Sequence, residues 1–239
     1  MMHSSEEPAS ENRTAHYVNS QAKRVAISAA LSSTAGSIWA LGIDRDGTGI
    51  SNHMIIQNGT DSSISLHEYY LHWGQAKVVP EGILPCLNED DALFHAAGGW
   101  ASTGSNGIVT YQLDEDTFLH ILWDCPYNFN HYCNFIGLYL CDKSKRKPSG
   151  DLFTRMEQYV KDPDMRPERR SPFDLVCCGP GDRSFSSNGE KAWGVRRPCE
   201  VMNGKYYAAM TMGDSHKTSS TVTILTTKSL PQFVMCKAK

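Results

Sequence analysis

Residues 107–139 contain the pattern that decides the fold, GIVTYQLDEDTFLHILWDCPYNFNHYCNFIGLY. Two runs rich in β-branched and aromatic residues, 107–113 and 117–123, are joined by an acidic turn, which predicts a pair of β-strands. Proline has no amide hydrogen to donate to a strand ladder, so we expect the second strand to end near Pro126. The segment Tyr127–Phe135 then forms an aromatic loop, whose rings and amides suit a surface that contacts a lipid headgroup, a sugar or a partner.

The same strand signal recurs along the chain, separated by turn dipeptides such as Asp46-Gly47 and Asn203-Gly204. The predicted strands are 38–43, 53–57, 92–97, 107–113, 117–123, 132–140, 206–212 and 221–226. Frequent short strands with only two helical stretches are typical of a mainly β protein, and we expect a β-sandwich. Residues 163–197 are rich in Pro, Gly, Arg and Ser and are interpreted as long irregular loops.

Two helices are expected beside the sandwich. Between residues 14 and 31, small apolar side chains recur at helical spacing, at Val18, Ala22, Val25 and Ala29. In the second helix, 150–161, apolar side chains including Phe153, Met156 and Tyr159 share one face. Residues 1–13 are polar and acidic and are interpreted as a disordered segment, so that residues 14–239 form a single domain.

The composition excludes several classes of protein. An apolar content of 40% and a charged content of 21% over 239 residues are typical of a folded globular protein. The formal net charge of -3 gives no overall attraction to nucleic acid. There is neither an apolar run of membrane-spanning length nor a secretory signal, so the protein is either intracellular or a processed product. The eight cysteines allow disulfides or buried thiols, and both remain open.

Residues 104–139 resemble, without gaps, the actinoporins, pore-forming cytolysins best known from sea anemones, and their actinoporin-like relatives. The likeness rests on the strand Gly107–Tyr111 and on the loop Cys125–Phe135, and it extends more weakly over about residues 15 to 228. It implies a β-sandwich with one helix packed on each face, an architecture also found in fungal fruit-body lectins. It further implies an N-terminal helix, with Val18, Ala22, Val25 and Ala29 on its apolar face, that detaches to line an oligomeric pore.

The resemblance also implies where a membrane lipid binds. The positions of the headgroup pocket are Asn58, Asn106, Asp124, Pro126, Tyr132 and Phe135, and the membrane-facing positions are Tyr127, Phe129, His131, Phe153, Met156 and Tyr159. The expected ligand is a choline lipid, sphingomyelin or phosphatidylcholine, because aromatic ring faces attract a quaternary ammonium. This chain departs from the family pattern at Asn58, Asn106 and Asp124, and it lacks the tryptophans expected at His131 and Phe135.

The departures leave two functions open. The first is an actinoporin-like pore former that binds a phospholipid, assembles into a homo-oligomer and inserts residues of about 14–31. The second is a non-lytic, lectin-like module that binds a lipid or a carbohydrate, since the polar residues Asn58, Asn106 and Asp124 also suit sugar hydroxyls. A pore former would be secreted and act at a target-cell membrane, whereas a cytoplasmic location is the alternative.

Catalysis, metal binding and nucleic-acid binding find little support. Cys125 and Cys133 fall in or beside strand-like segments, where thiols are usually inert, and Cys177-Cys178 is not a CxxC pair. We therefore expect no enzyme activity, cofactor or metal. The basic run 143–147 is interpreted as a patch beside the aromatic loop that attracts anionic lipid, or as a solvated turn. No nucleic-acid-binding motif accompanies it.

Overall fold

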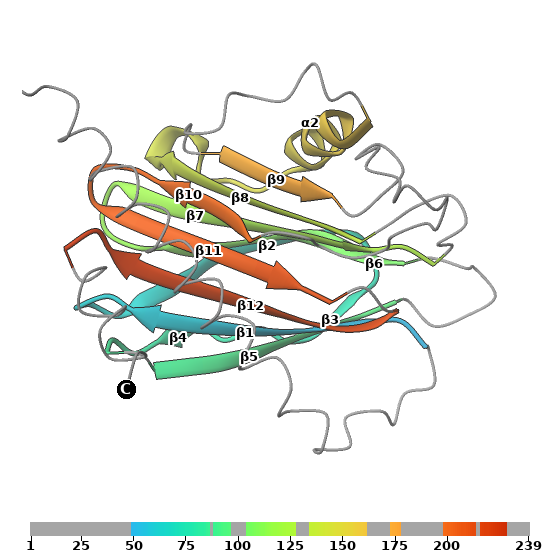
Figure 1. Ribbon diagram of the computed structural model, residues 1–239, viewed down its shortest axis with the longest axis horizontal. Coiled ribbons are helices and arrows are strands. Elements are labelled where there is room, and N and C mark those ends of the chain that lie inside the picture. Colours follow the sequence, from blue (N-terminus) through green and yellow to red (C-terminus); the bar gives the residue numbers. More distant parts are fainter. Residues whose placement is uncertain are drawn as a thin grey trace, which may run out of the picture.

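The computed structural model describes residues 49–86, 88–96, 104–127, 134–161, 173–177, 198–213 and 216–228. Their strands form two sheets (Figure 1). Sheet A contains, in spatial order, β10 (Cys199–Met202), β11 (Tyr206–Met212), β12 (Lys217–Thr226), β1 (Ser51–Gly59), β5 (Asn88–His95) and β3 (Gln75–Val78). Sheet B contains β4 (Gly82–Ile83), β2 (Ile64–Trp73), β6 (Ser105–Gln112), β7 (Thr117–Cys125), β8 (Phe135–Asp142) and β9 (Phe173–Cys177). Neighbouring strands are antiparallel, except for β1 and β12, which run parallel.

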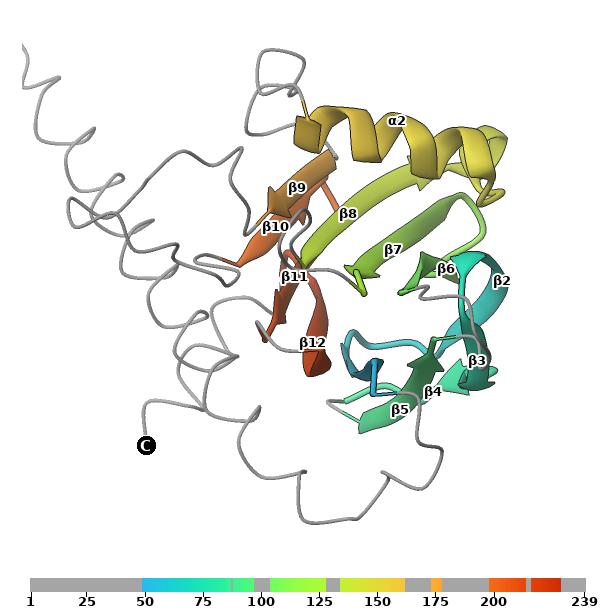
Figure 2. The same cartoon turned by 90° about the vertical axis from the view of Figure 1, so that its right-hand side faces the viewer.

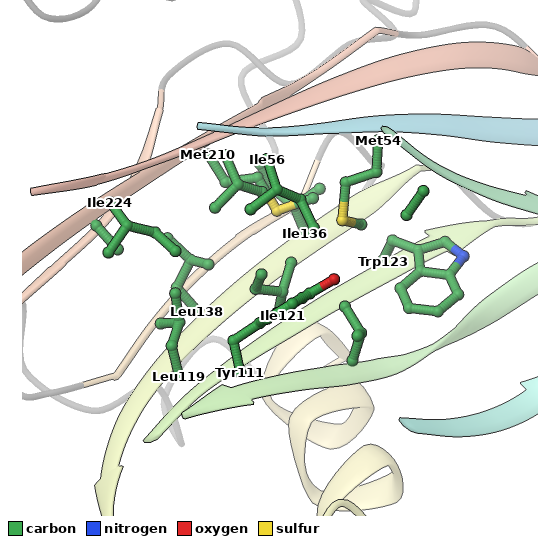
Figure 3. Close-up of a cluster of buried hydrophobic side chains, with 14 of the residues drawn as sticks. Met54, Ile56, Tyr111, Leu119, Ile121, Trp123, Ile136, Leu138, Met210 and Ile224 are labelled. Carbon is green, nitrogen blue, oxygen red and sulfur yellow. The ribbon is translucent and has the colours of Figure 1, made fainter. Parts of the chain in front are cut away.

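The facing surfaces of the two sheets share one hydrophobic core. Successive residues of a strand point to opposite faces, so every second residue is directed inward. Figure 3 shows the meeting side chains: Met54, Ile56, Met210 and Ile224 from sheet A, and Tyr111, Leu119, Ile121, Trp123, Ile136 and Leu138 from sheet B. The rings of Trp123 and Phe94 stack with their centroids 3.9 Å apart and join β7 to β5. The predicted mainly β sandwich is therefore confirmed.

Helix α2 (Gly150–Lys161) covers the outer face of sheet B, away from β12 (Figure 2). Ser149 caps the helix, because its hydroxyl accepts a hydrogen bond from the amide of Leu152 at 3.2 Å. On the buried face, Phe153 and Met156 are each only 1% exposed. They form a second hydrophobic cluster with Ile108, Leu122 and Phe135 of the sheet. The predicted helix at 150–161 is confirmed with these bounds.

The structure differs from the sequence prediction in the use of this helix face. Phe153 and Met156 were predicted to face a membrane, and this is wrong for the conformation described, because both are buried between α2 and sheet B. The opposite face of the helix presents Thr154, Arg155 and Gln158 to solvent. The side chain of Tyr159 lies outside the described residues.

Every predicted strand within the described residues corresponds to an observed one, namely β1, β5, β6, β7, β8, β11 and β12. Strand β7 ends at Cys125, immediately before Pro126, as expected. Strands β2, β3, β4 and β10 were not predicted. Strand β9 contradicts the interpretation of 163–197 as irregular throughout. The predictions for 1–13, 14–31 and 38–43, including the pore-helix positions Val18, Ala22, Val25 and Ala29, lie outside the described residues.

A glycine allows the chain to cross from sheet B to sheet A between β2 and β3. Gly74 has a φ of +103°, a backbone conformation that favours glycine. A Cβ atom at this position would lie 2.3 Å from the carbonyl oxygen of His95 and 3.3 Å from the Cα of Ser105. Backbone from both sheets therefore approaches Gly74 so closely that only a hydrogen atom fits.

We expect the substitution Gly74→Ala to lower the free energy of unfolding by about 2 kcal/mol or more, since an unfavourable φ and a backbone clash act together. Urea denaturation checks this. Gly204→Ala is the matched control, because a Cβ there would meet no atom within 4 Å and should change stability by less than about 0.5 kcal/mol. Equal effects of the two substitutions would contradict a steric requirement at the crossing.

Candidate functional site

A row of four side chains crosses the outer face of sheet B at the end where β7 stops and β8 starts. The register pairs Trp73 with Asn106, Asn106 with Asp124, and Asp124 with Phe135. Directly opposed residues of antiparallel strands point to the same face. Because Phe135 packs under α2, that face is the outer one. This set, called the end row, contains Trp73, Asn106, Asp124 and Phe135.

The middle of the end row is a buried polar pair. The side-chain amide of Asn106 donates a hydrogen bond to Oδ1 of Asp124 at 3.1 Å, and each residue is 8% exposed. The Oδ1 atom of Asn106 is buried and has no hydrogen-bond partner among the residues that the structure describes. A buried polar atom without a hydrogen bond lowers the stability of the fold by about 1–3 kcal/mol. The pair therefore suits a ligand that donates hydrogen bonds or carries a positive charge.

Two exposed aromatic side chains are close to this pair in the register or in the chain, since Trp73 is paired with Asn106 and Tyr127 follows Asp124 by three residues. Trp73 is 51% exposed and Tyr127 is 52% exposed. The ring of Trp73 meets that of His72 edge-on, with centroids 5.5 Å apart, and His72 stacks on Phe153 at 4.8 Å. These contacts hold Trp73 on the outer face beside α2. Tyr127 directly follows the buried Pro126 and is exposed, and its membrane-facing role stays a prediction.

The ends of the predicted aromatic loop are tied to the connection between β11 and β12. Nε2 of His216 donates a hydrogen bond to the carbonyl oxygen of Tyr127 at 2.9 Å. At the other end, the amide of Asn134 donates to the carbonyl oxygen of Gly213, also at 2.9 Å. Between these anchors, the predicted site residues Phe129, His131 and Tyr132 lie outside the described residues.

One of the predicted pocket residues does not line a shared pocket with the polar pair. Asn58 is fully buried, and its side-chain amide donates to the carbonyl oxygens of Ser62 and Ile83 at 2.9 Å, so it stabilises a turn. Ile83 lies beside the Gln112 end of β6. Asn106 is therefore about 20 Å away along the strand.

Phe135 is 4% exposed and contacts the helix cluster. Its ring packs against α2, and its role as a pocket wall stays a prediction.

The basic run also lies elsewhere than predicted. The 3-10 helix η2 (Lys143–Lys145) follows the last residue of β8, whereas the aromatic loop precedes the first. Strand β8 has eight residues, so the two segments are separated by about 25 Å. The expectation that the run lies beside the aromatic loop is wrong. Its turn is held instead by Asp142, which accepts a hydrogen bond from the amide of Ser144 at 2.9 Å.

Sequence reasoning missed Trp73, because β2 was not recognised as a strand. Its segment, ISLHEYYLHW, is exposed along most of its length and lacks the alternation of buried and polar residues. A signal was nevertheless present. Aromatic residues make up much of the segment 69–73, and aromatic residues are enriched in strands.

A buried histidine on the same face has a structural role. Nε2 of His120 donates to the carbonyl oxygen of Lys145 at 2.9 Å, and Nδ1 accepts from the hydroxyl of Thr110 at 2.7 Å. Burial lowers the pKa of His120 to about 4, against the opposing effect of the Lys145 carbonyl and with a further lowering by His67. The ring is therefore neutral at physiological pH and joins β6, β7 and η2.

The outer face of sheet A is buried over a central stripe. Ile55, Ala209 and Leu225 are at most 1% exposed, as are Thr221 and Thr223. By strand parity these residues point away from the core, since Met54, Ile56 and Ile224 point into it. No helix among the described residues packs on this face. The stripe thus consists of small and medium-sized side chains, both apolar residues and threonines.

Neither family models nor curated proteins give a match to this chain. Solved structures with a similar fold include the lipid binding protein Nakanori, with 11% sequence identity, a TM-score of 0.49, and coverage of 74% of this chain and 72% of that chain. A lectin of Xerocomus chrysenteron is also similar, with 9% identity, a TM-score of 0.39, and coverage of 73% of this chain and 99% of that chain. At these identities the likeness concerns the fold alone. Among the described residues, no helix is long and apolar enough to span a membrane.

We expect acid to destabilise the fold through His120. Below pH 6.5 the unfolded chain binds a proton at this ring, whereas the folded chain does so only near pH 4. About 3 kcal/mol of stability should therefore be lost as the pH falls through this window. Urea denaturation between pH 7 and pH 4, compared with His120→Gln, isolates the effect. A variant with the same pH dependence as the wild type would contradict it.

Proposed function

We propose that this protein binds membranes by taking up the cationic headgroup of a choline lipid at the end row of sheet B. The observation that carries this proposal is the Asn106–Asp124 pair, with the exposed ring of Trp73 beside Asn106 in the end row. A quaternary ammonium is attracted both to a carboxylate and to the faces of aromatic rings. The end row combines both features at the end of the sandwich from which the aromatic loop departs.

The sign of the charge sets the orientation of the lipid. Asp124 attracts the ammonium group and repels the phosphate, so the ammonium lies deeper and the phosphate stays toward solvent. The basic run at η2 is about 25 Å away along β8 and is too far to contact the same phosphate. This arrangement favours zwitterionic choline lipids, such as sphingomyelin and phosphatidylcholine, over anionic lipids.

Pore formation follows in this proposal from the N-terminal residues. The small apolar side chains Val18 and Ala22 match the stripe on the outer face of sheet A, where Ala209 and Thr221 leave room for close packing. A helix at about 14–31 would dock there before membrane contact and detach afterwards. The resemblance to actinoporins supports the subsequent insertion and the assembly of a homo-oligomeric pore.

A second candidate, a non-lytic lectin-like module, is favoured by the same polar pair. A pyranose ring packs its apolar face on an exposed indole such as Trp73, while its hydroxyls donate to carboxylate and amide oxygens. The unpartnered Oδ1 of Asn106 suits such a hydroxyl. In both candidates the protein binds without catalysing a reaction, needs no cofactor, and acts outside the cell that makes it, at a target membrane. A cytoplasmic binding module is the alternative location.

We expect Trp73→Ala and Asp124→Asn each to weaken binding to phosphatidylcholine–sphingomyelin vesicles by about five- to thirtyfold, because each removes an attraction of roughly 1–2 kcal/mol. Vesicle co-sedimentation measures the affinity. Leu84→Ala, at an exposed apolar position elsewhere, and Asp116→Asn, in an exposed turn, are the matched controls and should bind normally. Unchanged binding by both site variants would overturn the headgroup assignment.

We expect saturating protein to release dye from sphingomyelin vesicles, and deletion of residues 1–31 to abolish release while retaining binding. The reason is that the deletion removes the inserting helix and leaves the end row intact. Binding without release by the full chain would rule out the pore and support the module. Competition by a free pyranose sugar, but not by phosphocholine, would assign the site to a glycan.

A further inference from the structure

Within the described ranges, strand β2 has an open edge along most of its length. One edge pairs with β6. On the other edge, β4 pairs only with Ile64 and Ser65, and the amide of Leu66 still donates to the carbonyl oxygen of Glu81 at 2.7 Å. Beyond Leu66, no strand among the described residues lies along this edge. Unpaired backbone groups on an edge strand are a template for pairing with another strand.

The open edge contains the stretch Glu68–His72, in which four residues, Glu68–Leu71, pair regularly with β6. Bulges interrupt the pairing with β6 between Leu66 and Glu68 and again between Leu71 and Trp73. Between the bulges, the side chains alternate without interruption. Tyr69 and Leu71 lie on the side of the hydrophobic core, while Glu68, Tyr70 and His72 lie on the side of α2.

This stretch is complementary to itself. An antiparallel pair of two copies, related by a two-fold axis through Tyr70, places Glu68 of each copy opposite His72 of the other. It also places Tyr69 opposite Leu71, and the two Tyr70 residues face each other. Each contact is favourable, because a carboxylate opposes an imidazole and an aromatic ring opposes an aliphatic side chain on the same face. Tyr69 is 44% exposed in the single chain and would gain burial.

We propose that two copies of this chain associate edge to edge through Glu68–His72 and join their B sheets into one continuous antiparallel sheet. The first bulge precedes the paired stretch, and the second involves only its last residue, His72, so that Glu68–Leu71 form the regular part of the ladder. Helix α2 starts above Tyr70 and runs over the sheet toward β9, away from the open edge (Figure 2). The surface involved is separate from Asn106 and Asp124, and the inference does not depend on lipid binding.

Exchanging the charges at Glu68 and His72 tests the register of the proposed pair of β2 strands. The wild type should dimerise reversibly in sedimentation equilibrium between 1 and about 100 μM without lipid, in the range expected of a small interface. Glu68→Lys should raise the dissociation constant by about tenfold, because two symmetry-related pairs lose their attraction. The double variant Glu68→Lys/His72→Glu restores opposite charges and should recover the dimer. Failure of recovery, with an unchanged circular dichroism spectrum, would overturn the register.

A crosslink tests the two-fold axis independently. Directly opposed residues of antiparallel strands have their Cα atoms about 4.5–5.5 Å apart, which is within reach of a disulfide. Tyr70→Cys should therefore form a covalent dimer under mild oxidation, identified by the mass of the linked β2 peptides. Glu115→Cys, in the exposed turn between β6 and β7, is the control and should stay uncrosslinked. A wild type that is monomeric at every concentration, or equal crosslinking of both variants, would overturn the proposal.

Discussion

The stacking of Trp123 on Phe94 between the two sheets fixes which face every residue of β7 presents. With Trp123, Ile121 and Leu119 in the core, strand geometry directs Asp124, Leu122 and His120 outward. A shift of the strand by one residue would exchange the two sets and bury a carboxylate among apolar side chains, at a cost of several kcal/mol. The packing of the core therefore determines where the polar pair lies, on which surface α2 packs, and that His120 points to the outer face.

The outer face of sheet B divides into three zones along β7. Asp124 with Asn106 lies at the loop end, Leu122 lies under α2 in the middle, and His120 lies beside η2 at the far end. Because the helix occupies the middle zone, its aromatic residue Phe153 serves the fold and leaves binding to other rings. In the part of the chain that the structure describes, the exposed rings near the loop end are those of Trp73 and Tyr127. Ligand binding and helix packing thus use neighbouring rows of one surface, which meet at Phe135.

The sequence predicted what depends on local pattern and failed where distance in space matters. The hairpin of β6 and β7, the stop before Pro126 and helix α2 each follow from residues close in the chain. An amphipathic helix identifies which residues share a face, but it does not reveal whether that face meets a sheet or a lipid, so Phe153 and Met156 were misassigned. The basic run seemed close to the loop only because strand length was not counted. Strand β2 escaped prediction because an edge strand exposes both of its faces.

The open edge of β2 and the end row constrain each other, because both involve the same strand. A two-fold axis through Tyr70, perpendicular to the sheet, reverses the direction of every strand in the second copy. The two Trp73 residues then lie on the same outer face but at opposite ends of the joined sheet. A flat bilayer that meets the aromatic loop of one copy faces the opposite end of the other copy. Pairing through β2 therefore prevents both copies from docking on one membrane by their loops, so edge-to-edge association and membrane docking oppose each other.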